Sequence, residues 1–327
     1  MFDKDKFKIY LQSLKADNDL ISRTVDLVSK FQEFSTKHIN MEETKLIETY
    51  SDEVISGSGN EVEKLVGLAR YCKFTGNKEG LIYLLSLFNS VGVIESFRNR
   101  AKLFGFDDFF SEYDDPSLGI KPEKYLPKIE KALSNVLKTI PHKTYRKILA
   151  SNHHQIPIEV FNEDKKRFIE LGSIDKFLEY RHYKMISEME NCLRENRLWF
   201  EQNITREVLD FVKSNQEIQA GIRKDNRIYV TKIPSKVDKY LNETDKRKRR
   251  YLSCHCPFVR DSIIDENTKI SSEWCYCTGG FEKLIFDVIY DQELEVELLE
   301  SVLDENGSKC RFAIVLPKNY LDWEKNE

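Results

Sequence analysis

The stretch LEVELLESVLDENGSKCRFAIVL, residues 294–316, predicts a β-hairpin. Two runs rich in apolar and β-branched residues, 294–303 and 310–316, flank a polar segment that contains Asn306 and Gly307. Asn-Gly is the strongest short-range signal for a turn between two strands. We therefore expect two antiparallel strands joined at this point.

A two-residue turn at this dipeptide fixes which residues face each other. Leu303 would lie opposite Cys310, and both faces of the hairpin would be largely apolar. We therefore expect helices on both sides of it. Glu300 and Arg311 would be diagonal neighbours within an apolar face, either as a structural ion pair or as a clamp for a ligand.

The segments before the hairpin complete a small α/β unit. Residues 228–233 are typical of a strand, and a short helix follows at 235–243. Residues 250–256 are a further candidate strand, and 274–290 carries apolar residues along one helical side. These patterns indicate an α/β sandwich with a small antiparallel sheet over residues 216–327.

The sequence before this unit is helical throughout. Apolar residues recur at three- and four-residue spacing, as at Leu65 and Leu68, and no repeat of 20 to 50 residues is present. We expect a helical domain over residues 1–215, followed by the cysteine-containing domain over 216–327. The fold class is therefore α+β, an all-helical N-terminal region followed by the α/β sandwich.

Composition excludes several functional classes. The net charge of −4 gives no general attraction to nucleic acid, and the basic run from Lys246 to Arg250 is short enough to be a solvated face. No apolar run approaches the roughly 18 residues of a membrane span. The first residues alternate in charge and lack the apolar core of a secretory signal, so we expect a cytoplasmic location. The expected partner is a small-molecule ligand, with a homodimer left open.

Two C-x-C pairs lie close together in the predicted α/β unit: Cys254 and Cys256, then Cys275 and Cys277. The first pair would share one face of a strand, with His255 pointing to the other face. The second pair would lie at a helix start, where the positive dipole favours thiolates. Four thiolates gathered here would match a tetrahedral zinc site.

Other interpretations of these cysteines stay open. The C-x-C spacing is shorter than the usual C-x2-C of structural zinc sites, and it needs a bend, which Pro257 would supply. A reactive thiol or redox pair, or inert buried cysteines, are the alternatives. Cys310 would add a fifth thiol, and Gly279-Gly280 suggests close approach by a backbone or a ligand.

The sequence does not decide whether the protein is an enzyme. In an enzyme, Cys275 or Cys277 would be a nucleophile whose pKa is lowered by the helix start. His255, or a histidine of the loop at His153-His154, would then act as the base, and a small C–N or C–S bond would be hydrolysed.

Two strings in this region carry a family resemblance: C-P-F-V-R from Cys256 and G-x-x-C-R-F-x-I from Gly307. Residues 220–317 resemble the 4-vinyl-reductase-type small-molecule-binding domain and the related domain of 2-amino-thiazoline-4-carboxylate hydrolase-like proteins. The resemblance implies an α/β sandwich with an antiparallel sheet, in which cysteines together with a histidine bind metal beside an apolar ligand pocket. The cysteines that match the family's positions are Cys254, Cys256, Cys275 and Cys310.

Two further resemblances widen the choice of function. The strings C-H-C-P-F-V-R and W-C-Y-C-T-G-G-F make the whole chain similar to an uncharacterised prokaryotic family. The expected α/β fold also resembles subunits of vesicle-tethering complexes, which would imply a scaffold rather than a binding protein or an enzyme.

Overall fold

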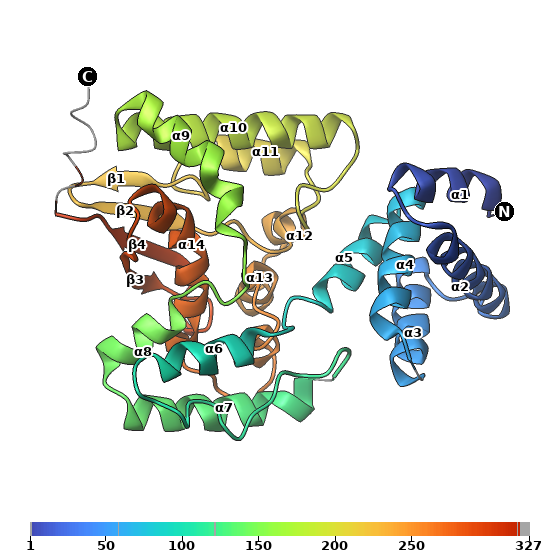
Figure 1. Ribbon diagram of the computed structural model, residues 1–327, viewed down its shortest axis with the longest axis horizontal. Helices are drawn as coiled ribbons and strands as arrows, with labels where there is room; N and C mark the ends of the chain where they lie inside the picture. Colours follow the sequence, from blue (N-terminus) through green and yellow to red (C-terminus); the bar gives the residue numbers. More distant parts are fainter. Residues whose placement is uncertain (1, 58, 121, 319, 321–327) are drawn as a thin grey trace. The chain divides into compact units, whose positions relative to one another are not determined.

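The computed structural model describes residues 2–57, 59–120, 122–318 and 320, and Figure 1 shows their arrangement. Contacts divide the chain into two compact units. The first comprises Met1–Asn89 and Ser117–Gly119, and the second comprises Ser90–Pro116 and Ile120–Glu327. The predicted α+β class is confirmed, because helices fill the N-terminal part and a small antiparallel sheet follows near the other end. The predicted division at residue 215 falls inside the second unit.

The first unit is a helical bundle whose helices bury one apolar side each. Phe7, Phe31 and Leu68 form part of its core, and the side chain of Asp17 caps a helix by accepting from the backbone N–H of Leu20. Cys72 also lies in this core. The helices are α1 (Lys4–Ser13), α2 (Asn18–Lys37), α3 (Glu43–Ser56), α4 (Glu61–Thr75) and α5 (Lys78–Ser86).

The second unit combines a small sheet with helices that precede it and that lie between its second and third strands. The helices before the sheet are α6 (Val93–Lys102), α7 (Pro122–Thr139), α8 (His142–Leu149), η1 (Ile158–Phe161), α9 (Asn162–Leu171), α10 (Ile174–Arg194) and α11 (Arg206–Lys213). The helices between its second and third strands are α12 (Val237–Asn242), α13 (Lys246–Ser253), η2 (Arg260–Ile263), η3 (Ser272–Cys275) and α14 (Tyr276–Ile289). No helix among the described residues is both long and apolar enough to cross a bilayer.

The sheet contains β1 (Ile222–Lys224), β2 (Arg227–Thr231), β3 (Glu295–Glu300) and β4 (Arg311–Val315), in the order β1-β2-β4-β3. All three strand pairs are antiparallel. Helix α14 packs on the face that carries Val230 and Ile314 (Figure 1). The opposite face carries an ion pair between Arg227 and Glu297. The prediction of two apolar, helix-covered faces was therefore wrong, because the sheet presents ion-paired side chains on one face.

The hairpin exists, but its predicted register was wrong. Val296 pairs with Ile314 and Leu298 pairs with Phe312, and a bulge follows before Glu300. The connection between the strands is therefore a long loop rather than a two-residue turn. The chain leaves the sheet after Glu300, and Val302 and Leu303 are buried in the core that contains the cysteines. Burial of these apolar side chains favours this path of the loop.

Gly307 allows two backbone segments of this loop to approach closely, and it does not form a two-residue hairpin turn. Its N–H donates to the carbonyl of Asp304 at 2.9 Å. A Cβ atom at this position would lie 1.8 Å from the carbonyl oxygen of Ser301, so only glycine fits.

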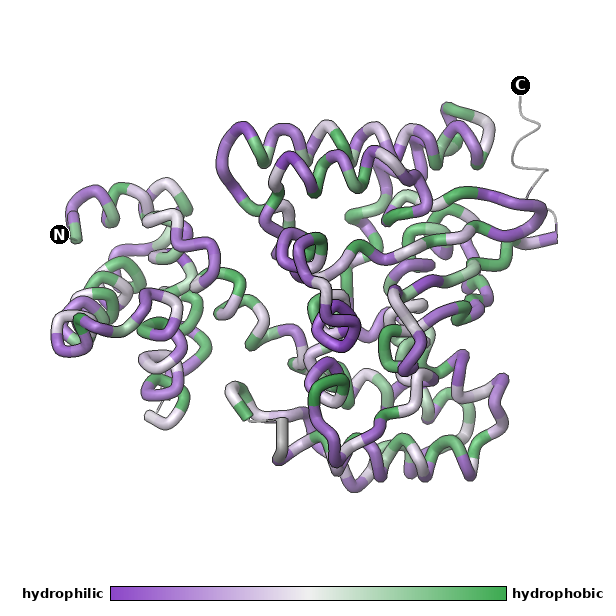
Figure 2. Tube along the Cα trace, turned by 180° about the vertical axis from the view of Figure 1, so that it is seen from behind, coloured by the Kyte–Doolittle hydropathy of each residue, from purple (hydrophilic) through white to green (hydrophobic). Residues whose placement is uncertain are grey.

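Residues 250–256 were predicted as a strand, but most of them belong to α13. The side chain of Asp245 caps this helix by accepting from the N–H of Lys248 at 2.8 Å. The arginines of the basic run are structural. Arg247 donates to the carbonyl of Ile263 at 2.6 Å, and Arg250 donates to that of Val302 at 2.8 Å. Although α13 is strongly hydrophilic (Figure 2), these two guanidinium groups are engaged with neighbouring backbone.

Candidate functional site

The five clustered cysteines come from four places in the chain and meet in one core. Cys254 and Cys256 follow α13, and the backbone of Cys254 is extended. Cys275 ends η3, and Cys277 lies in the first turn of α14. Cys310 directly precedes β4. All five belong to or pack against the core that also contains Trp274 and Val302. The seven cysteines of the chain are free thiols.

Cys275 and Cys310 belong to the same core and lie near enough for each thiol to act on the pKa of the other. The Cys275 sulfur lies 3.2 Å from the Ser301 hydroxyl oxygen. Cys254 lies near both residues. Its charge raises the pKa of Cys275, and the charge of Cys310 raises the pKa of Cys254. We call Cys254, Cys275 and Cys310 the three-thiol cluster.

Cys256 and Cys277 lie beside this cluster with different partners. The indole N–H of Trp274 donates to the sulfur of Cys256 at 3.2 Å. The charge of Cys256 acts on Cys277, as does that of Lys232. The structure therefore gathers all four predicted metal-binding cysteines in one region, together with Cys310.

The pKa values of the helix-start cysteines differ from expectation. The interaction with the thiol of Cys310 and burial raise the pKa of Cys275, and burial raises the pKa of Cys277. The prediction that the helix start lowers these values was wrong, because removal from water outweighs the dipole. The neighbouring thiol of Cys275 lowers the pKa of Cys310.

His255 is engaged away from the thiols. Its Nε2 lies 2.7 Å from the carbonyl oxygen of Ile233. Burial, followed by the charge of Lys232, lowers the pKa of His255 to about 3. A neutral imidazole that donates Nε2–H to a backbone carbonyl holds that segment in place, and this contact gives it no part as a base toward a cysteine.

The glycine pair at the start of α14 is explained by packing. A Cβ on Gly280 would lie 2.6 Å from the carbonyl carbon of Ala150 and 2.7 Å from the nitrogen of Ser151. A Cβ on Gly279 would lie 3.2 Å from side-chain atoms of Phe312. The close approach predicted for these glycines is therefore made by the protein's own backbone and sheet.

Glu300 and Arg311 face each other in the ladder but bind other partners. Glu300 accepts from both the N–H and the hydroxyl of Ser308 at 2.7 Å. Arg311 donates to both carboxylate oxygens of Glu217, at 2.6 and 3.1 Å, and its guanidinium lies over the ring of Tyr229. The predicted ion pair between Glu300 and Arg311 was wrong, because residue 217, outside the hairpin, supplies the carboxylate.

A buried ion pair next to the cysteines was missed. Lys232 Nζ donates to Glu282 Oε1 at 2.6 Å and lies 4.3 Å from the ring centroid of Phe281. The other carboxylate oxygen of Glu282 accepts from Gln219 at 3.1 Å. The sequence held a signal for it, since Lys232 continues the two-residue alternation of the buried side chains of β2.

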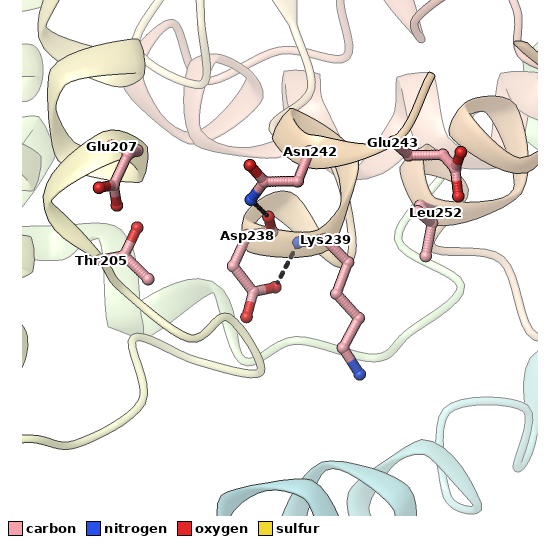
Figure 3. A pocket seen from close by; sticks show the side chains of 7 residues that line it. All are labelled: Thr205, Glu207, Asp238, Lys239, Asn242, Glu243 and Leu252. Carbon is pink, nitrogen blue, oxygen red and sulfur yellow. Dashed lines mark hydrogen bonds between the residues drawn. The ribbon is translucent and has the colours of Figure 1, made fainter. Parts of the chain in front are cut away.

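The described residues contain no group of three or more His, Cys, Asp or Glu side chains arranged to hold a metal ion. The three-thiol cluster supplies soft donors of the kind that zinc prefers, but not in a ready coordination geometry. An open cavity of about 630 Å³ lies elsewhere in the second unit (Figure 3). None of the predicted site residues lines it; its lining is Thr205, Glu207, Asp238, Lys239, Asn242, Glu243 and Leu252.

Comparison with known proteins gives one match. A sequence model described as "Family of unknown function (DUF6144)" matches residues 239–321, which include both C-x-C pairs and Cys310. Searches of the curated proteins and of the solved structures found no match.

Proposed function

We propose that the protein binds a soft metal ion, zinc in the first place, through the three-thiol cluster, and that a small molecule completes the coordination. The observation that carries the proposal is that the buried cysteines Cys254, Cys275 and Cys310 gather in one core, where each acts on the pKa of another. Three segments that are distant in sequence bring these thiols together.

The charges within the cluster favour a cation. Burial and the charges of Cys256 and Cys310 raise the pKa of Cys254, so the cluster resists carrying several thiolates. A divalent ion reverses this balance, because each thiolate then gains an attractive partner and releases its proton on binding. Zinc and other soft ions prefer sulfur ligands, which supports this class of metal.

A small-molecule ligand follows from the number of protein donors. Three protein ligands leave one position of a tetrahedral ion open to water or a small molecule. The resemblance to small-molecule-binding domains supports the same assignment. Because the thiols are not arranged as a ready ligand set, binding requires their side chains to change rotamer.

We also propose that the protein acts in a reducing compartment such as the cytoplasm. Its cysteines are free thiols, and such compartments keep thiols reduced.

The test is the zinc content of the reduced protein. Protein purified without oxygen is incubated with zinc, freed of excess ion and analysed for metal by mass spectrometry. One equivalent is expected in the wild type, and less than a tenth of it in Cys275→Ser and Cys310→Ser.

The matched control is Cys192→Ser, which removes a buried cysteine from a different core and should keep the metal. Absence of tightly held zinc in the reduced wild type, or equal zinc in wild type and Cys275→Ser, contradicts the proposal.

A further inference from the structure

Arg260 is the last residue of the string C-P-F-V-R that begins at Cys256, and it is the first residue of η2. Its backbone N–H donates to the carbonyl of Cys256 at 3.1 Å, so the two residues span one turn of helical geometry. Side chains that are four positions apart in such a turn lie on the same side of it. The side chains of Arg260 and Cys256 are therefore neighbours.

The guanidinium group of Arg260 has no anionic partner in the described part of the chain. It lies over the ring of Tyr251, with its central carbon 5.1 Å from the ring centroid. Its Nε atom is buried and has no hydrogen-bond acceptor, and no carboxylate among the described residues forms an ion pair with it. A buried donor without an acceptor is rare in folded proteins, because it carries the full cost of its removal from water.

Other arginines of the second unit show the contrast. Arg247 and Arg250 donate to backbone carbonyls at 2.6 and 2.8 Å. The Nε atom of Arg100 also lacks an acceptor, but a terminal nitrogen of that side chain is paired with Glu293. Arg260 has neither kind of partner, so its positive charge is available to a ligand.

The carboxylate next in sequence is engaged elsewhere. Asp261 Oδ2 accepts from the hydroxyl of Tyr125 at 3.2 Å, and this hydroxyl also donates to the carbonyl of Pro257 at 2.9 Å. Arg260 and Cys256 are both partly exposed. A small molecule can therefore approach the guanidinium and the neighbouring sulfur from solvent.

We infer that Arg260 binds a carboxylate group of the small-molecule ligand, next to the sulfur of Cys256. The inference rests on the proposed function, because the carboxylate is assigned to the molecule that completes the metal coordination.

The chemistry of the site favours a carboxylate over other anions. The planar fork of a guanidinium matches the two oxygens of a carboxylate. One guanidinium also balances one negative charge. A dianion such as phosphate would leave one charge uncompensated beside the carboxylate of Asp261, which is adjacent in sequence.

The experiment measures the alkylation of Cys256 in the full chain, which is reduced, freed of metal with a chelator and then separated from the chelator. Two reagents of similar size are compared: iodoacetate carries a carboxylate, and iodoacetamide is neutral. Each transfers its two-carbon group to the sulfur as iodide leaves. The ratio of the two rates at one cysteine therefore cancels the reactivity of the thiol itself. Mass spectrometry of the peptides gives both rates at Cys256.

The ratio of the iodoacetate rate to the iodoacetamide rate should be about tenfold higher in the wild type than in Arg260→Gln, because only iodoacetate gains a charged hydrogen bond. Arg260→Lys keeps the charge without the planar fork, so it should give an intermediate ratio. The matched control is Arg206→Gln, which removes an exposed arginine at the start of α11 and should keep the wild-type ratio.

A second measurement needs no variant. Sodium acetate, at constant ionic strength, should slow the reaction of wild-type Cys256 with iodoacetate, and inorganic phosphate should not. Equal ratios in the wild type and Arg260→Gln, no alkylation of Cys256 by iodoacetate, or equal protection by phosphate and acetate would overturn the inference. If Arg260→Gln fails to fold, protection of the wild type by acetate decides alone.

The result is separable from the metal proposal. Failure of carboxylate binding leaves zinc binding untouched, because zinc content is measured without a carboxylate ligand. Failure of zinc binding leaves the alkylation ratio untouched, because that ratio is measured in metal-free protein.

Discussion

Lys232 and Glu282 form an ion pair at 2.6 Å with side chains that are 10% and 3% exposed. Removal of one partner leaves the other charge buried without compensation, which costs about 3–5 kcal/mol. Glu282→Ala should therefore lower the free energy of unfolding by about that amount in denaturant titrations.

The matched control for this pair is Glu297→Ala, which breaks the half-exposed pair with Arg227. A loss below about 1 kcal/mol is expected there. Equal losses in the two variants would show that burial of the Lys232 pair contributes nothing.

Gly280 makes the tightest contact of α14, since its added Cβ would meet the backbone at Ala150 and Ser151. Gly280→Ala should destabilise the fold by about 1–3 kcal/mol through overpacking, despite the better helix propensity of alanine. Gly279→Ala should cost less, because its Cβ would meet side chains of Phe312 and Val296, which can shift. Thermal unfolding of both variants checks the order, and a larger loss at Gly279 would refute it.

His153 should make the fold sensitive to acid. Burial lowers its pKa from 6.5 to about 3, and its imidazole bonds the Ser96 hydroxyl and the carbonyl of Ile148. The unfolded chain therefore binds a proton more readily, so stability is full above pH 6.5 and falls as the pH decreases toward 3. His153→Gln should flatten this part of the pH profile in urea titrations. An unchanged slope would show that His153 does not carry the effect.

Asp287 should make the fold less stable as the pH rises, which is opposite to the effect of His153. Burial raises its pKa from 3.8 to about 6, although it accepts from Lys283 and from the N–H of Leu294. The folded state binds the proton more tightly, so this contribution is full below pH 3.8 and is lost as the pH rises through 6. Relative to Asp287→Asn, the wild type should lose up to about 3 kcal/mol across this range. If the difference in unfolding free energy between the wild type and Asp287→Asn stays constant with pH, Asp287 does not make this contribution.

Sequence patterns predicted the elements whose signals are local. The strand that ends before Pro234 and the helix within residues 274–290 follow from residue type and spacing alone. The register of the hairpin did not follow. The signal at Asn306-Gly307 is real, but burial of Val302 and Leu303 decides where the chain leaves the sheet. Local turn preference was outweighed by tertiary packing.

The helix α13 was missed for a similar reason. A run of five basic residues lacks an apolar stripe, so it carries little helical periodicity. Its arginines are stabilised by carbonyls of Ile263 and Val302, which lie far away in sequence. Such partners are invisible to a pattern that looks only at neighbours.

Part of the candidate site could be predicted and part could not. The clustering of cysteines in sequence pointed to the correct region, and Cys310 was included as a fifth thiol. The approach of Cys310 to Cys275 could not be predicted from the sequence, because it depends on how the residues before β4 pack against the end of η3. The effect of burial on the thiol pKa values likewise depends on the surrounding core.

The close packing of α14 against residues 150–151 determines which fragments of the chain can be expected to fold. Phe97 and Tyr145 belong to the same hydrophobic core as Trp274, so the C-terminal third of the chain supplies only part of that core. A fragment that starts at residue 216 would expose that interior and should precipitate or stay molten. A fragment that starts near residue 90 includes the residues that complete this core. We expect this fragment, which is shorter than the full chain, to fold on its own.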